Sequence, residues 1–333
     1  MRVPILKFLL LSGLWLALAA SNAGAQTLLV VNQGDSTTSL IDAATGKLLS
    51  AVPDNTPGVH GHEVAASADG RFAFVPIYGS TGVGKPGIDG HEMLVIDIAA
   101  RKVVGHVDFG HGVRPHMPLL DPVSGNLYVT TELDDKVTII DPKTWKIVGA
   151  IPTGAKESHM LAVSHDGSRG YTANVGPGTV SVLDMKARKT LGVIPVAGSV
   201  QRISISADDK LVFTSDVTKP QLAAIDTVTQ KVKTWVPLPS QGYGTAATPD
   251  GRWLLVCIPA KNQVAVVDLR TMQVARVVDV GKAPQEILIR PDAKVAYVSC
   301  EDSDQVAAID LAQWKVEKLI AAGSRADGLA WAR

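Results

Sequence analysis

The stretch LYVTTELDDKVTIIDPKTWKIVGAIPTG, residues 127–154, contains the pattern that decides the fold. A β-branched strand ends in a polar turn, a second strand ends in Ile-Asp-Pro, and a third strand runs into Pro-Thr-Gly. Parts of the same pattern recur as VSVLDMKARKTLGVIPVAG, VAVVDLRTMQVARVVDVG and VAAIDLAQWKVEKLIAAG. Repeats of about 42 residues are typical of a β-propeller, in which each repeat forms one four-stranded antiparallel blade.

The register of the repeats predicts seven blades. Each innermost strand should lead into an Asp-Gly-like turn, as in SADG (67–70), SHDG (164–167) and TPDG (248–251). Counting seven residues back from the Asp of each turn, or from its equivalent, gives one position per blade. These seven positions, here called the ring positions, are His62, His116, His159, Gln201, Tyr243, Gln285 and Asp327. Their spacings are 54, 43, 42, 42, 42 and 42 residues, and the insertion YGSTGVGKPGIDGH at 78–91 explains the long first step.

The two ends of the chain are expected to close the ring. The segment TLLVVNQGDSTTSLIDAATGKLLSAV, residues 27–52, supplies a second, third and fourth strand without a first strand. The segment DGLAWAR, residues 327–333, supplies a first strand without the others. Together they complete one blade, and closure of the ring removes exposed sheet edges. The predicted fold class is therefore an all-β, seven-bladed β-propeller.

Residues 1–25 have the pattern of a cleavable signal peptide. Arg2 and Lys7 form a short basic start, FLLLSGLWLALAA is an apolar core, and Ala23-Gly24-Ala25 fits the small-residue cleavage pattern. The alternative, a membrane anchor, requires a longer apolar run to span a bilayer comfortably. We expect cleavage after Ala25, a periplasmic protein with no membrane insertion, and a single propeller domain over residues 26–333.

The charge balance of the chain excludes some classes of partner. The full sequence has 32 basic and 32 acidic residues, and removal of Arg2 and Lys7 leaves 30 basic against 32 acidic. A near-neutral chain has no basic footprint for nucleic acid and no polybasic patch for a membrane surface. We expect a monomer whose partner is a small molecule or a protein at the mouth of the channel.

Two cysteines, Cys257 and Cys300, lie near the ends of second strands in neighbouring blades. An exported protein permits a disulfide between them. Equivalent strands of adjacent blades are far apart for the short Cα separation that a bridge needs, so the spacing favours two free, partly buried thiols.

The repeats resemble the YVTN family of bacterial β-propellers, whose name echoes Tyr-Val-Thr at residues 128–130. The resemblance covers residues 27–333, and a more distant one extends to the propeller domains of cytochrome d1-type nitrite reductase and nitrous-oxide reductase. It implies seven blades, secretion or a periplasmic location, and closure by the terminal strands. It carries no catalytic residue over to this chain, because a shared fold does not imply a shared function.

The ring positions are the candidate site, because propellers bind ligands at the mouth of the central channel. Numbering the blades from the one that carries His62, blades one to three contribute histidines, whereas the other four contribute Gln201, Tyr243, Gln285 and Asp327. The insertion at 78–91 is Gly-rich and emerges on the same face, as a lid would. Further candidate ligand-binding residues at this mouth are Arg114, Arg202, Lys85 and His91.

Three imidazoles on a rigid scaffold are a recognised way to hold a transition metal. We predict that His62, His116 and His159 bind zinc or copper and leave an open coordination position. Glu63 and Glu157 are close enough in sequence to hydrogen-bond a ligand histidine, to add a fourth ligand or to act as a general base. Polar residues that simply line a wet channel are the plainer interpretation of the same histidines.

Three functions remain open from the sequence. The first is a binding or accessory protein that holds a small molecule, a metal or a redox cofactor at the channel mouth. The second is a metal-dependent enzyme, which would be a hydrolase or lyase with zinc and an oxidoreductase with copper. The third is a protein-interaction scaffold, which fits the repeats equally well.

Overall fold

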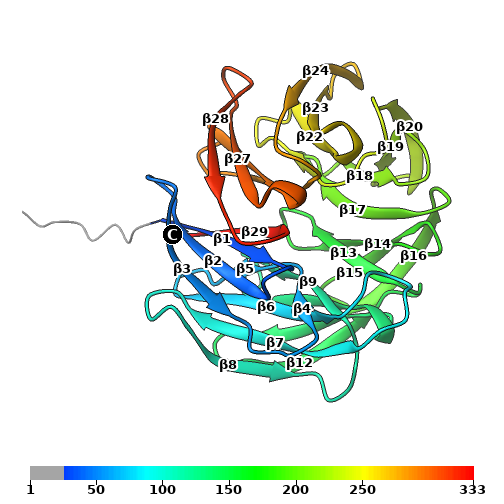
Figure 1. Cartoon of the computed structure of the whole chain (residues 1–333). Helices are drawn as coiled ribbons and strands as arrows, with labels where there is room; N and C mark the ends of the chain where they lie inside the picture. The colour runs from blue at the N-terminus through cyan, green and yellow to red at the C-terminus, as the bar shows by residue number, and fades with distance from the viewer. Residues whose placement is uncertain (1–25) are drawn as a thin grey trace, which may run out of the picture.

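The computed structural model describes residues 26–333, and these residues form a ring of seven β-sheets around a central channel (Figure 1). The predicted all-β, seven-bladed propeller is confirmed. The predicted signal peptide, residues 1–25, lies outside the described residues. No helix in the described part of the chain is long and apolar enough to cross a membrane.

Each blade is an antiparallel sheet that runs from the channel outward in chain order. Blade one contains β4 (His60–Gly61), β5 (Ala65–Ala66), β6 (Phe72–Gly79), β7 (Asp89–Asp97) and β8 (Lys102–Asp108). Blade two contains β9 (Pro115–Leu120), β10 (Leu127–Thr131), β11 (Lys136–Asp141) and β12 (Lys146–Pro152). Blade three contains β13 (Ser158–Val163), β14 (Arg169–Asn174), β15 (Thr179–Asp184) and β16 (Lys189–Pro195). Blade four contains β17 (Val200–Ile205), β18 (Leu211–Asp216), β19 (Gln221–Asp226) and β20 (Lys231–Pro237).

The remaining blades repeat this order, with one difference at closure. Blade five contains β21 (Thr245–Ala247), β22 (Trp253–Ile258), β23 (Gln263–Asp268) and β24 (Gln273–Asp279). Blade six contains β25 (Pro284–Ile289), β26 (Val295–Cys300), β27 (Gln305–Asp310) and β28 (Lys315–Ala321). Blade seven contains β29 (Ala326–Ala332), β1 (Thr27–Asn32), β2 (Thr37–Asp42) and β3 (Lys47–Pro53). Three short 3-10 turns also occur: η1 (Glu132–Asp134), η2 (Pro259–Lys261) and η3 (Glu301–Ser303).

The two chain ends close the ring as the sequence predicts. The last strand, β29, is the innermost strand of blade seven and pairs with β1, with Thr27 opposite Ala332 and Leu29 opposite Ala330. This pairing leaves no unpaired strand edge at the point where the two ends of the chain meet.

The core lies between the blades rather than at the centre of the ring. Second strands such as β22 and β26 are buried at every residue, because they face a neighbouring blade on both sides. Outermost strands alternate between exposed and covered residues, and six of the seven begin with lysine. Lysine at an exposed strand edge disfavours pairing with another chain.

A β-bulge interrupts most of the innermost strands at the ring position. In blade four, Val200 pairs with Asp216 and Ile203 pairs with Thr214, so that Gln201 and Arg202 share a single partner residue. Similar register shifts occur in blades two, three, six and seven. In blade one the extra residue is instead Tyr78, on the second strand β6. Because a bulge re-aims the side chains of the bulged strand, the ring position and the residue after it can both reach the channel.

Cys257 and Cys300 are free thiols, and both side chains are buried. This is the state that the spacing of the two blades favours. Both cysteines belong to the same apolar cluster between blades five and six, where they pack as small hydrophobic residues.

Asp54 is an exception to the apolar pattern between blades. It follows β3, its side chain is buried, and its carboxylate makes no well-formed hydrogen bond within residues 26–333, although the backbone N–H of Gly61 is near enough to oppose the rise of its pKa. Thr153 has the matching place after β12, and its hydroxyl donates to the carbonyl oxygens of Asp135 and Ala155. Burial raises the pKa of Asp54 to about 6, because a charged carboxylate in this place loses its hydration.

We expect Asp54→Thr to stabilise the protein at pH 8 by about 2–3 kcal/mol, since one pKa unit corresponds to about 1.4 kcal/mol. A carboxyl with a raised pKa in the folded state stabilises the fold only while it is protonated, and this stability is lost as the pH rises from about 4 through about 6. Denaturant unfolding of both proteins should show a difference that vanishes near pH 4. A gain that does not depend on pH would contradict this assignment.

Candidate functional site

All seven ring positions line one cavity on the channel axis. The cavity has a volume of about 220 Å³. The rest of its wall comes from the insertion and from residues that neighbour the ring. These further lining residues are Gln33, His60, Ser80, Thr81, Gly82, Val83, Arg202, Glu301 and Arg325. The predicted register therefore brings the ring positions together in space, and the insertion forms part of the wall as a lid would.

Blades one to three supply an aromatic side to this cavity. The ring of His62 lies between those of His60 and His116, with centroid distances of 5.1 and 5.3 Å. His116 and His159 are closer still, at 3.6 Å with an angle of 32° between their planes. Tyr78 lies within 5.7 Å of the three ring histidines. The predicted histidine cluster is thus present, with His60 and Tyr78 added to it.

One histidine of the cluster is held by a buried carboxylate. Glu132 accepts a hydrogen bond from the hydroxyl of Tyr78 at 2.9 Å, and the same oxygen, Oε2, lies 2.9 Å from Nδ1 of His159. Tyr78 comes from β6 in blade one, Glu132 from η1 directly after β10 in blade two, and His159 from β13 in blade three. The chain of contacts therefore crosses three blades, and all three side chains are buried.

The other two histidines have a nitrogen without a partner. Nε2 of His62 and Nδ1 of His116 are buried, and neither makes a hydrogen bond to any described residue. Burial, together with the neighbouring histidines, holds the pKa of both side chains well below the usual value. Both imidazoles are therefore neutral at pH 7, and each neutral ring has one nitrogen lone pair available.

The three imidazoles do not converge on a metal position in this conformation. Among residues 26–333, no group of three or more His, Cys, Asp or Glu side chains is arranged to hold a metal ion. His116 and His159 instead lie ring against ring, with centroids 3.6 Å apart and planes inclined by 32°. Coordination by all three would require these two rings to separate.

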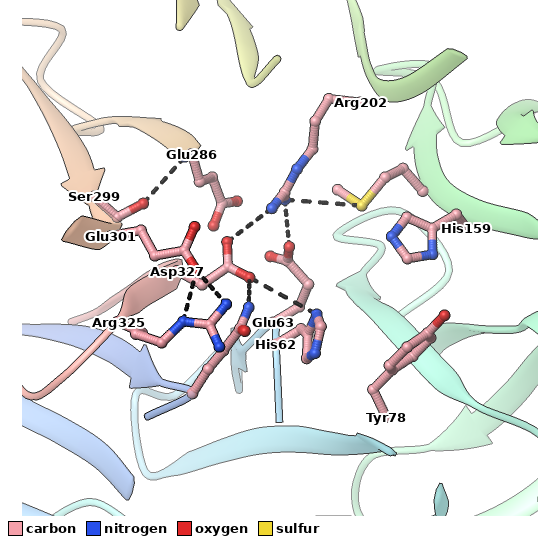
Figure 2. Close-up of polar contacts among 12 residues, drawn as sticks. His62, Glu63, Tyr78, His159, Arg202, Glu286, Ser299, Glu301, Arg325 and Asp327 are labelled. Carbon is pink, nitrogen blue, oxygen red and sulfur yellow. Dashed lines mark hydrogen bonds and ion pairs between the residues drawn. The ribbon is translucent and has the colours of Figure 1, made fainter. Parts of the chain in front are cut away.

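The opposite side of the cavity is ionic and centres on Arg202. This side chain extends from β17 in blade four across the channel, where Nη1 contacts Glu63 of blade one and Nη2 donates to Asp327 of blade seven at 2.8 Å (Figure 2). All three side chains are at most 5% exposed. Burial alone would lower the pKa of Arg202, but the two carboxylates outweigh it and hold that pKa well above its usual value.

A third carboxyl group gives this cluster a surplus of acid. Glu286 of β25 lies beside Glu63, and its Oε2 accepts a hydrogen bond from the backbone N–H of Leu329 at 2.6 Å. Burial raises the pKa of Glu63 well above its usual value and that of Glu286 to about 7. One guanidinium faces three carboxyl groups, so this side of the cavity favours a cation or a proton over an anion.

Two glycines allow the innermost strands of neighbouring blades to approach closely. A Cβ on Gly328 would lie 2.4 Å from the carbonyl oxygen of His62 and 2.5 Å from Cα of Glu63. A Cβ on Gly244 would lie 2.1 Å from the carbonyl oxygen of Gln285. The position after the ring residue is therefore glycine in blades five and seven, whereas it is ionisable in blades one, four and six.

Five residues singled out from the sequence do not line the cavity. Glu63 is buried behind the wall, where it contacts Arg202. Arg114 instead fastens the insertion, because its guanidinium donates to Asp89 at 2.5 Å and to the backbone oxygens of Gly82 and Lys85. The remaining three are Lys85, which is exposed, His91, which lies 3.4 Å from Asp108, and Glu157, which accepts from the N–H of Gly176.

The sequence reasoning missed a second set of equivalent positions, one at the end of each second strand, of which Gln33 and Glu301 line the cavity. In matching register these are Gln33, Tyr78, Glu132, Val175, Val217, Pro259 and Glu301. The polar members come from blades six, seven, one and two. Gln33 donates to Asp327 at 2.5 Å, and Glu301 accepts from Arg325. The same count of about 42 residues would have found this set, had it been applied to the second strand as well as to the first.

Comparison with known proteins supports the fold. No protein-family model matches the chain, and no curated protein sequence matches it. Among solved structures, hydrazine synthase of Kuenenia stuttgartiensis superposes with a TM-score of 0.68 at 17% identity, over 83% of this chain and 90% of that chain. The dihydro-heme d1 dehydrogenase NirN, in complex with DHE, superposes with a TM-score of 0.66 at 14% identity, over 91% of this chain and 74% of that chain. At these identities the likeness shows the fold.

We expect Arg202→Met to lower the free energy of unfolding by about 3–5 kcal/mol, because removal of one partner leaves buried carboxylates without a counter-charge. The loss should be smaller at pH values where Glu63, whose pKa burial raises well above its usual value, is protonated. The matched control is Arg270→Met, which removes an ion pair with Asp268 whose guanidinium is exposed, and it should change stability by at most about 0.5 kcal/mol. Equal losses in the two variants, measured by denaturant unfolding, would refute the central role of Arg202.

Proposed function

We propose that this protein is a periplasmic binding or accessory protein whose channel cavity holds a transition-metal ion, zinc or copper, through His62, His116 and His159. The observation that supports this proposal is the pair of buried nitrogens on His62 and His116 that lack a partner. A buried polar atom without a hydrogen bond costs about 1–3 kcal/mol, and such an atom calls for an explanation in each case. A ligand that accepts both lone pairs removes the cost.

The chemistry of the cavity favours a metal ion over an anion. Neutral imidazole is the form of histidine that binds metals, and the lowered pKa values of His62 and His116 keep both rings in that form. On the opposite side, three carboxyl groups face the single guanidinium of Arg202, and protons held there can be released when a cation binds. Zinc and copper both accept nitrogen ligands of this type.

The size of the cavity supports a small occupant. Pockets for drug-sized ligands measure about 300–1,000 Å³, whereas this cavity measures about 220 Å³. That volume suits an ion with its remaining waters, or an ion with a molecule of a few heavy atoms. Arg114 holds the insertion over the cavity, which would limit access to small partners.

A metal-dependent enzyme is the second candidate, and the buried carboxyl groups favour it. Glu63 and Glu286 have raised pKa values, and the pKa of Glu286 is about 7, the range in which a carboxyl group exchanges protons at physiological pH. A bound ion would supply Lewis acidity, with zinc favouring hydrolase or lyase chemistry and copper favouring oxidoreduction. Glu63 would then handle protons at the cavity, while Glu157 is already engaged by Gly176.

Protein isolated from its native compartment should contain close to one zinc or copper ion per chain by elemental analysis. His116→Ala should abolish this metal content, because it removes the middle imidazole of the cluster. The matched control is His106→Ala, since His106 is exposed on the outermost strand β8 and should leave the metal content unchanged.

Circular dichroism and thermal unfolding establish that both variants retain the propeller. Retention of the metal in His116→Ala would refute the proposed site. Absence of any metal from the folded wild-type protein, with no uptake of added zinc or copper, would leave the protein-interaction scaffold as the better function.

A further inference from the structure

The geometry points to Glu132 as the positioning residue for His159, which it holds with Nδ1 protonated so that Nε2 is the nitrogen offered to the cavity. This inference rests on the proposed function in one respect, which is that the ligand bound by His159 is a metal ion. The claim about the imidazole concerns the protein alone and can be tested without a metal.

The first step is the contact itself. Oε2 of Glu132 lies 2.9 Å from Nδ1 of His159. A carboxylate oxygen can only accept a hydrogen bond, so Nδ1 must carry a proton. In the neutral imidazole, the form that binds a metal, Nε2 then has the lone pair. Both side chains are at most 3% exposed, so water does not compete for either partner.

The second step is the support behind Glu132. The hydroxyl of Tyr78 donates to the same oxygen at 2.9 Å, and the backbone N–H of Glu132 donates to the carbonyl oxygen of Arg114. Glu132 begins the short turn η1, which follows β10 directly. The carboxylate is thus fixed by the backbone of its own blade and by a side chain of blade one.

The third step is that this position differs from its equivalents. Val175, Val217 and Pro259 take the same place in blades three, four and five, and their side chains cannot accept a hydrogen bond. Glu301 takes it in blade six, where the carboxylate binds Arg325 instead of a ring residue. In the described structure, a carboxylate at this position contacts a ring histidine only in blade two.

The consequence concerns ligand binding at His159. A carboxylate that accepts from a histidine fixes the tautomer and orientation of the ring and raises its basicity toward a metal, and loss of such a partner typically costs about 10- to 100-fold in affinity. Glu132 therefore contributes to the site through His159 without facing the ligand itself.

The test measures the tautomer of His159 in the metal-free protein. Nitrogen-15 NMR of the histidine side chains, with His159 assigned through His159→Gln, should show Nδ1 protonated and Nε2 unprotonated in the wild type. In Glu132→Gln, which keeps the shape of the side chain, the amide can either donate or accept, so we expect a mixture of the two tautomers. Titration with Zn²⁺ should show an affinity about 10- to 100-fold lower than that of the wild type.

The matched control is Tyr78→Phe, which removes one hydrogen bond to Glu132 but keeps the carboxylate beside His159. It should retain the Nδ1-protonated tautomer and lose much less Zn²⁺ affinity than Glu132→Gln. Thermal unfolding separates a loss of structure from a loss of positioning, because a purely structural role of Glu132 would change stability without changing the tautomer.

Two results would overturn the inference. One is a His159 whose Nδ1 is unprotonated in the wild type, and the other is a tautomer that Glu132→Gln leaves unchanged. If the wild type binds no Zn²⁺ while the tautomer responds to Glu132→Gln, the metal proposal fails and the positioning role of Glu132 stands. The two failures are therefore distinguishable.

Discussion

The rest of the site depends on the buried ion pairs that Arg202 makes with Glu63 and Asp327. Arg202 brings one positive charge across the channel to two carboxylates from blades one and seven, at a depth where none of the three groups is hydrated (Figure 2). Because unpaired charges are costly in such a place, the guanidinium and the carboxylates must be present together. The contact also joins blade four to blade seven, in which the ring closes, and to blade one beside it. It lies next to the histidines without touching their free nitrogens.

The two sides of the cavity differ in chemistry, with histidines on one side and carboxyl groups around Arg202 on the other. On one side, burial keeps His62 and His116 neutral and leaves each with an unused nitrogen. On the other side, burial raises the pKa values of Glu63 and Glu286, which keeps protons within reach of the cavity. The same physical cause, loss of hydration, favours the neutral form on both sides. That form is an imidazole with a free lone pair on the histidine side and a protonated carboxyl group on the glutamate side. A cation with nitrogen ligands fits this combination better than an anion does.

The repeated blade explains how such different side chains come to share one level. Each innermost strand presents the same backbone place to the channel, and in most blades a bulge brings the following residue to the channel as well. A substitution at the ring position of one blade can therefore change the chemistry of the cavity without altering the core between blades. Gly244 and Gly328 show the limit of this freedom, since any side chain there would strike the neighbouring blade.

The number of blades, the closure by β29 and the common level of His62, His116 and His159 follow from the sequence alone, because a propeller places residues at intervals of one repeat. The partners of those residues do not follow from it. Arg202 meets Glu63 across 139 residues and Asp327 across 125 residues, and Glu132 meets His159 from another blade. Contacts across the channel depend on its width, on the bulges and on side-chain conformation, none of which leaves a period in the sequence, so the tertiary structure alone decided them.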